Sequence, residues 1–282
     1  MKSRALACAV ALALAPPWSA AAEPVQIKPA ALRLNGNLEI PAGKSMSDGV
    51  ALVLPDALSH HGHETIAALQ AHLKDDGVAT LAITLSLGID DRKGARACEV
   101  PHAYTMADTG GELDRWIEWL QLNGARSIDL IGFSRGGTEV AVMAAQRRAL
   151  HRIVLLAPAF ATSAELAESY ARTFGQPLKP VLDGARAAPL ETRPVDFLSC
   201  RRAPVTGAAF VDAYREIPPE ITTEIPQPVL VMIAGSDEIV PDLDKKLPAA
   251  VRRVVIEDAG HFFQDLYGED AADAIADFLT EP

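Results

Sequence analysis

The segment from residue 127 to residue 137 limits the possible folds more than any other part of the chain. Its largely apolar opening predicts a short buried strand, and the pattern Gly-x-Ser-x-Gly follows at residues 132 to 136. This pattern is typical of a sharp strand-to-helix turn that presents the serine hydroxyl above the end of a parallel sheet. Glycine relieves the backbone crowding of such a turn. The helix that follows would aim its N-terminus, which favours negative charge, at Ser134.

Two further motifs begin where predicted strands end. Asp237 lies in Gly-Ser-Asp-Glu-Ile-Val-Pro after the apolar run 229–233, and His261 lies in Gly-His-Phe-Phe after the run 253–256. A serine hydroxyl is a poor nucleophile until a histidine takes its proton, and a carboxylate holds that histidine in the required tautomer. The order serine, aspartate, histidine, each at the exit of a strand, therefore predicts that Ser134, His261 and Asp237 act together.

Each of these three assignments has a competing interpretation. Ser134 could be an ordinary turn serine, and His261 could be a packed loop histidine. Asp237 could cap a loop while Glu238 or Asp242 supplies the carboxylate. The prediction requires that three loops far apart in the chain meet at one edge of one sheet.

With these three motifs in this order, the chain resembles the α/β-hydrolase family over roughly residues 48 to 282. The resemblance implies an α/β fold for residues 23–282: a mostly parallel, doubly wound sheet with N-terminal antiparallel strands and a helical cap insertion at about residues 160–224. Ordinary crossover helices without a gating role are the competing interpretation of that insertion. The resemblance also implies a two-step acyl transfer in which Ser134 attacks a carbonyl and water hydrolyses the acyl-enzyme, and it implies no cofactor.

The alternation of strands and helices along the chain supports this fold class. It predicts a mostly parallel sheet with helices on both faces. In front of the sheet, Asn35-Gly36 lies among alternating apolar and polar residues and predicts a hairpin turn between antiparallel edge strands. The predicted strands include 50–54, 79–85 and 153–157, and the predicted helices include 63–73 and 108–122.

An oxyanion hole must hold the charge that forms on the attacked carbonyl oxygen, and losing one of its donors typically costs about 100- to 1000-fold in rate. The backbone N–H of Arg135 is one predicted donor. The resemblance places the other at Ala57, where the family usually carries His-Gly and this chain carries Pro55-Asp56-Ala57. Either Asp56 points away from the site, or the hole is weak or adapted to an unusual substrate.

The N-terminus has the features of a targeting segment. Lys2 and Arg4 precede the apolar stretch Ala5–Ala15, and Ala20-Ala21-Ala22 supplies the small residues of a cleavage site. We expect a signal peptide over residues 1–22, cut after Ala22, and a periplasmic or secreted protein. An uncleaved anchor is the alternative. The apolar stretch is too short to span a bilayer as a helix, and we expect no integral membrane span after its removal.

Export would leave Cys98 and Cys200 in an oxidising compartment, where an even number of cysteines predicts a disulfide. Closing a loop of roughly 100 residues would contribute about 4–5 kcal/mol in the chain-entropy model. Two unrelated thiols are the alternative.

A histidine-rich run raises the question of a metal site, because imidazole is a common ligand of transition metals. We instead interpret the histidines of residues 60–63 as a helix cap and a pocket lining and the Asp90-Asp91 run as a solvated loop, and we predict no metal. The residues considered are His60, His61 and His63, with His102, Asp90 and Asp91.

The net charge of −11 disfavours nucleic acids and anionic membrane surfaces as partners. The sequence therefore predicts an exported serine hydrolase that cleaves a carboxylic ester, or a thioester or amide, of a small-molecule acyl substrate. An acyltransferase that uses the same three residues is one alternative. A non-catalytic binding or accessory protein of the envelope with a hydrolase fold is another, because fold does not fix function. No sequence feature indicates an oligomeric state.

Overall fold

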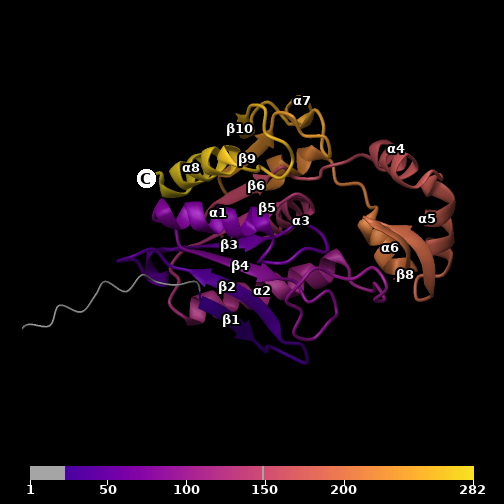
Figure 1. The fold of residues 1–282 in the computed structure, drawn as a ribbon, viewed down its shortest axis with the longest axis horizontal. Helices are drawn as coiled ribbons and strands as arrows, with labels where there is room; N and C mark the ends of the chain where they lie inside the picture. Colours follow the sequence, from indigo (N-terminus) through magenta and orange to yellow (C-terminus); the bar gives the residue numbers. More distant parts are fainter. Residues whose placement is uncertain (1–22, 148) are drawn as a thin grey trace, which may run out of the picture.

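An eight-stranded sheet forms the centre of the computed structural model, which describes residues 23–147 and 149–282 (Figure 1). The strand order is β1-β2-β4-β3-β5-β6-β9-β10. The pairs β1–β2 and β2–β4 are antiparallel and the other five pairs are parallel, which confirms the predicted sheet. The strands are β1 (Glu23–Ile27), β2 (Leu34–Glu39), β3 (Val50–Leu54), β4 (Thr80–Thr84), β5 (Ile128–Phe133), β6 (Ile153–Leu156), β9 (Val229–Ala234) and β10 (Arg252–Ile256).

Helices cover both faces of the sheet, because the central strands are apolar on both sides. Every residue of β3, β4, β5 and β6 is buried. Helices α2 (Met106–Leu122) and α3 (Arg135–Ala144) pack on one face, and α1 (Glu64–Asp75) and α8 (Leu266–Thr280) pack on the other. The short helices are η1 (Met46–Asp48), η2 (Pro219–Glu224) and α7 (Leu243–Lys246).

The predicted turn at Asn35-Gly36 is wrong, although the antiparallel strands themselves are present. Strand β2 runs straight through these two residues, and the connection from β1 to β2 lies at residues 28–33. Gly36 serves close packing instead: a Cβ there would lie 3.0 Å from the Ala82 carbonyl oxygen and 3.4 Å from Trp116. Tertiary contact, not turn geometry, explains this glycine.

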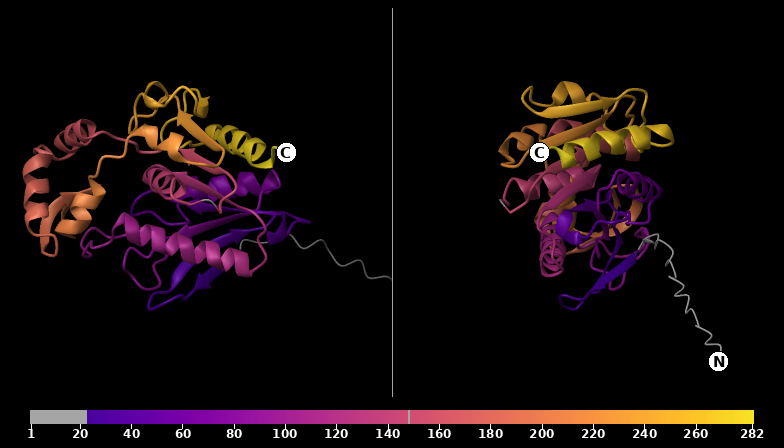
Figure 2. Two further views of the ribbon diagram at one scale, coloured as in Figure 1. Left: turned by 180° about the vertical axis from the view of Figure 1, so that it is seen from behind. Right: turned by 90° about the vertical axis from the view of Figure 1, so that its left-hand side faces the viewer.

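The insertion between β6 and β9 stands to one side of the sheet, in orange (Figure 2). It contains the expected helices and also an antiparallel β7–β8 hairpin that the sequence did not predict. Pro194 and Pro204 are opposite each other in this two-stranded sheet and mask its strand pattern. Its elements are α4 (Ser163–Phe174), α5 (Leu178–Ala187), β7 (Thr192–Phe197), β8 (Cys200–Thr206) and α6 (Gly207–Ala213).

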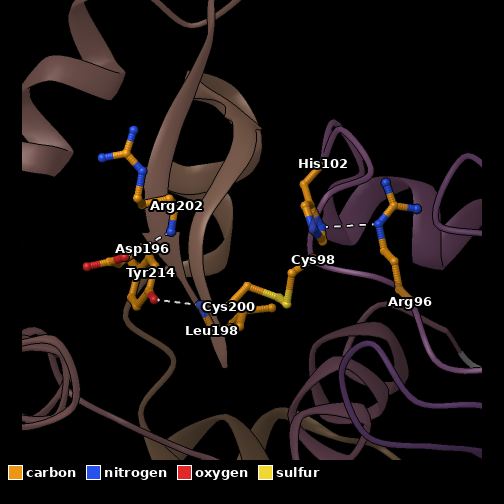
Figure 3. The surroundings of a disulfide bond; sticks show 8 residues. All are labelled: Arg96, Cys98, His102, Asp196, Leu198, Cys200, Arg202 and Tyr214. Atoms are coloured by element: carbon orange, nitrogen blue, oxygen red, sulfur yellow. Dashed lines mark hydrogen bonds between the residues drawn. A yellow bond between two sulfur atoms is a disulfide. The ribbon is translucent and has the colours of Figure 1, made fainter.

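A disulfide joins the insertion to the main sheet domain, as predicted (Figure 3). Cys98 follows β4 and Cys200 begins β8, and their Cα atoms are 5.4 Å apart. Main-chain hydrogen bonds reinforce the link, because the His102 N–H donates to the Pro204 oxygen and the His102 oxygen accepts from Thr206. The insertion is therefore covalently attached to the main sheet domain.

The predicted signal peptide, residues 1–22, lies outside the described residues. Within residues 23–147 and 149–282, we find no helix with the length and apolar character that a membrane span requires.

Candidate active site

Ser134 lies at the sharp turn from β5 to α3, where its backbone adopts φ 54° and ψ −121°. The two motif glycines allow this turn. A Cβ on Gly132 would lie 2.5 Å from the Gly136 oxygen, and a Cβ on Gly136 would lie 2.2 Å from the Pro55 oxygen. Neither position accepts a side chain: Gly132 lets the start of α3 pack against β5, and Gly136 lets the loop after β3 approach the serine turn.

The three predicted side chains meet in one hydrogen-bonded chain. Ser134 Oγ lies 2.8 Å from His261 Nε2, and His261 Nδ1 lies 2.8 Å from Asp237 Oδ2. Asp237 rather than Glu238 contacts the histidine, and Asp242 instead pairs with a lysine. The loops after β5, β9 and β10 supply the three residues, which converge as the strand order predicts.

Asp237 is held as an ionised acceptor. Burial on its own raises the pKa of this carboxyl, but hydrogen bonds from His261 and from the backbone lower the pKa below its usual value overall. Its Oδ1 accepts the N–H groups of Ile239 at 2.8 Å and Val240 at 2.7 Å. Because a carboxylate only accepts, His261 donates through Nδ1, which leaves Nε2 free to accept the Ser134 proton.

Asp56 turns its carboxyl group into this site. Its Oδ1 accepts the backbone N–H of Ala57, and the Arg135 N–H and the Ser134 hydroxyl lie near enough to favour its charged form. Burial raises the pKa of Asp56 despite these contacts. Of the two orientations considered, the structure therefore has the one in which the carboxyl points into the site and occupies the Ala57 N–H, one of the two donors predicted for the oxyanion hole.

A cleft of about 470 Å³ opens over Ser134 and His261, between the sheet and the insertion. This volume lies in the range of small-molecule sites. Phe262 lines the cleft, whereas Phe263 is buried in the core. The insertion supplies much of the aromatic wall, which the sequence did not predict because the contributing positions follow no local pattern. The aromatic residues of the cleft are Phe160, Tyr170, Phe174, Tyr214 and Phe262.

Two ion pairs involve residues that line the cleft. Glu165 of α4 pairs with Lys246 of α7 at 2.8 Å and so links the insertion to the main domain. The Arg135 side chain pairs with Glu139 at 3.1 Å and donates to the Ala213 oxygen. Arg135 is therefore engaged with protein groups, and Glu139 is a site neighbour that the sequence analysis missed.

The histidine-rich run forms separate local contacts. The His61 ring lies 2.6 Å from Thr84 Oγ1, His60 accepts the Gly62 N–H, and His63 packs against Phe262. Among the described residues, no three histidine, cysteine or acidic side chains are grouped as metal ligands would be.

Comparisons with known proteins agree with this architecture. The family model described as "Alpha/beta hydrolase family" matches residues 45–278. A comparison with curated protein sequences gives no match.

Several solved structures are similar to the chain. Est1E from Butyrivibrio proteoclasticus with bound ferulic acid aligns with a TM-score of 0.68 and 21% identity, over 90% of this chain and 97% of that chain. An esterase from Pyrococcus furiosus aligns with a TM-score of 0.60 and 18% identity, over 92% and 90%. Dienelactone hydrolase from Anabaena variabilis aligns with a TM-score of 0.56 and 17% identity, over 92% and 96%. At these identities the likeness concerns the fold. From the family match over most of its length, the chain belongs to the alpha/beta hydrolase family.

Proposed function

We propose that this protein is a serine hydrolase that cleaves a carboxylic ester through Ser134, His261 and Asp237. The observation that carries the proposal is the hydrogen-bonded chain from Asp237 through His261 to Ser134, at 2.8 Å in both steps, at the base of a cleft. Such a chain on the turn from a strand into a helix is the arrangement that activates a serine for acyl transfer.

Each residue has a defined task in the proposed reaction. His261 Nε2 takes the Ser134 proton as Oγ attacks the ester carbonyl, and then gives that proton to the leaving alcohol. Asp237 keeps the imidazole in the required tautomer and stabilises its protonated form. Water then attacks the acyl carbonyl as His261 removes one of its protons. The bond to Ser134 Oγ breaks, His261 returns the proton to Oγ, and the acyl group leaves as a carboxylic acid. The N–H groups of Arg135 and Ala57 stabilise the negative oxygen in both steps.

The cleft supports an ester with an apolar or aromatic group. Its aromatic wall favours such a group by burial and ring contacts. Est1E, which shares the fold, was solved with ferulic acid bound. Esters of an aromatic acid are therefore the first substrates to test, beside p-nitrophenyl acetate.

A fluorophosphonate probe tests the proposed nucleophile directly. We expect it to label the wild-type protein and to leave Ser134→Ala unlabelled. Ser236→Ala is the matched control, because this exposed serine lies in the loop beside Asp237, and its labelling is expected to match the wild type. Wild-type protein that neither reacts with the probe nor hydrolyses any ester offered would contradict the proposal.

The occupied oxyanion hole favours one second candidate, a non-catalytic binding or accessory protein with this fold. A carboxyl group on the Ala57 N–H opposes the negative charge of an oxyanion. That candidate predicts ligand binding in the cleft without turnover and without probe labelling, so the same experiment separates the two.

We also propose that the protein is exported and processed after Ala22. The composition of residues 1–22 supports this, and so does the Cys98–Cys200 disulfide, since such bonds persist in oxidising compartments. Sequencing the N-terminus of the mature protein is expected to give Glu23. An N-terminus at Met1 in protein purified from the envelope would refute the cleavage.

A further inference from the structure

The position of the Asp56 carboxyl conflicts with the reaction proposed above, because it competes with the substrate for hydrogen-bond donors. It accepts the Ala57 N–H, so one of the two predicted donors of the oxyanion hole is engaged, and it lies near the other, the Arg135 N–H. A substrate carbonyl oxygen needs these same donors, and losing one of them typically costs about 100- to 1000-fold in rate. For efficient turnover, the carboxyl must leave this position when a substrate binds.

A second, smaller cavity beside the cleft could hold the displaced Asp56 carboxyl. Its volume is about 50 Å³, and its lining includes Asp56, Ala57 and Arg135, which also border the cleft. This space is large enough for a carboxyl group or a few waters. Asp56 thus lies on the wall between the two spaces.

The small cavity has polar groups that lack partners. The Ser59 hydroxyl, the His102 Nε2 and the Tyr104 hydroxyl are buried and have no hydrogen-bond partner within the described part of the chain. All three residues line this one cavity. Buried polar groups in proteins are nearly always hydrogen-bonded. Three unpaired groups together therefore indicate that the cavity binds a further polar group.

The three groups are suited to an acceptor such as a carboxyl oxygen. Arg96 Nε donates to His102 Nδ1 (Figure 3), and the two nitrogens are 3.2 Å apart. The neutral ring therefore carries its proton on Nε2 and donates there. The two hydroxyls can also donate. A carboxylate has several lone pairs and donates no hydrogen bond, so it can accept hydrogen bonds from all three groups at once.

The Arg92 guanidinium favours an acidic group in the cavity, although the Glu112 carboxylate also acts electrostatically on Arg92 and Tyr104. The Arg92 guanidinium lines the cavity and donates to four backbone carbonyl oxygens, and among the described residues no carboxylate lies at ion-pair distance from it. The two acids on the same wall are already engaged: Glu139 with Arg135, and Asp212 with the Met106 N–H. Asp56 is the nearby acid whose present position conflicts with the proposed chemistry.

We propose that Asp56 is a two-position gate of the oxyanion hole: its carboxyl closes the hole in this structure and moves into the small cavity, onto Ser59, His102 and Tyr104, when a substrate carbonyl enters. The backbone next to the gate is strained, since Leu58 has φ 61°, a conformation that side chains other than glycine seldom adopt. Strain of this kind is common in segments with two alternative states. The gate rests on the proposed hydrolase function.

A double-mutant cycle tests the gate, with kcat/KM for p-nitrophenyl acetate and the rate of fluorophosphonate labelling as readouts. We expect Asp56→Ala to raise both at least 10-fold, because the hole is then open. We expect Tyr104→Phe to lower both several-fold in the wild-type background and to have no effect in the Asp56→Ala background, because its role is to receive Asp56. Tyr267→Phe, a tyrosine of α8 on the opposite face, is the matched control and is expected to leave both unchanged.

Each outcome has a defined meaning. A decrease with Asp56→Ala, or an equal effect of Tyr104→Phe in both backgrounds, overturns the gate; the second result would mean that the cavity holds water independently of Asp56. Labelling of wild type and Asp56→Ala at equal rates also refutes the gate while it supports the nucleophile. No labelling of either protein refutes the proposed function instead.

A structure of the phosphonylated wild-type protein provides a readout that does not depend on rates. We expect the phosphoryl oxygen on the Ala57 and Arg135 N–H groups, and the Asp56 carboxyl within hydrogen-bond distance of Tyr104. An adduct with Asp56 in its present position, or exposed to solvent, would contradict the gate.

Discussion

Replacing Asp237 with asparagine is expected to remove most activity while it leaves the fold intact. Asp237 Oδ1 accepts two backbone N–H groups, at 2.8 and 2.7 Å, and Oδ2 accepts from His261. The oxygen of an asparagine amide must face the two backbone donors, so its NH₂ group faces His261 Nδ1. Because an amide NH₂ only donates, Nδ1 has to become an acceptor, and the ring proton moves to Nε2.

The changed tautomer of His261 determines how much activity Asp237→Asn loses. A protonated Nε2 cannot take the proton of Ser134, which lies 2.8 Å away. The corresponding asparagine substitution in serine proteases lowers kcat by about 10⁴-fold. This loss equals about 5.5 kcal/mol of transition-state stabilisation. Stability should change little, since asparagine has nearly the same volume and keeps both backbone hydrogen bonds.

The assay compares kcat, probe labelling and Tm for the wild type, Asp237→Asn and Asp242→Asn. The last is the matched control, because Asp242 was a candidate acid in the sequence but pairs with Lys245. We expect wild-type kcat for the control. If Asp237→Asn retains kcat within tenfold of the wild type while folded, the assigned tautomer and the role of His261 as the base are both wrong.

Three further changes test other parts of the structure. Cys98→Ser is expected to destabilise the protein by up to about 4–5 kcal/mol through loss of the 102-residue cross-link, measured by urea unfolding, with no further effect of a reductant on the variant. Gly136→Ala is expected to lower Tm and abolish activity because its Cβ meets backbone at 2.2 Å, whereas Gly111→Ala, with open space around it in α2, should stabilise the helix by about 0.5–1 kcal/mol. Hydrogen bonds from Lys246 and, to a lesser extent, from Thr162 lower the pKa of Glu165 from 4.5 to about 2. The contribution of this carboxylate to stability is therefore complete above about pH 4.5 and is lost as the pH falls towards 2. Glu165→Gln should therefore flatten the pH dependence of unfolding in that window, and an unchanged profile would argue against this ion pair.

The central sheet was predictable because its strands are continuous apolar runs. Strands buried on both faces leave this signature in the local sequence, so β3, β5 and β9 lie where the pattern places them. Residues at the carboxyl ends of these strands meet at one edge of the sheet. The meeting of Ser134, Asp237 and His261 could for that reason be predicted from their positions after strands.

Local signals failed where distant contacts determine the conformation. The pair Asn35-Gly36 is typical of a turn, but this segment is extended and packs closely against Ala82 and Trp116. The β7–β8 hairpin contains prolines opposite each other, which local propensity treats as strand breakers, and its stability comes from packing on the insertion's own small core.

The sequence by itself indicated the fold family and the order of the three candidate residues, because both depend on residue type and on position relative to a strand. It also favoured one disulfide over two unrelated thiols, because two cysteines would remain after export. Only the tertiary structure decided where Asp56 points, which aromatic side chains line the cleft and which buried groups surround the small cavity. These features depend on donors and walls from segments distant in the chain, such as Arg135 after β5 and Tyr214 after α6. No local pattern encodes such a meeting, since burial and hydrogen-bond partners exist only once the chain has folded.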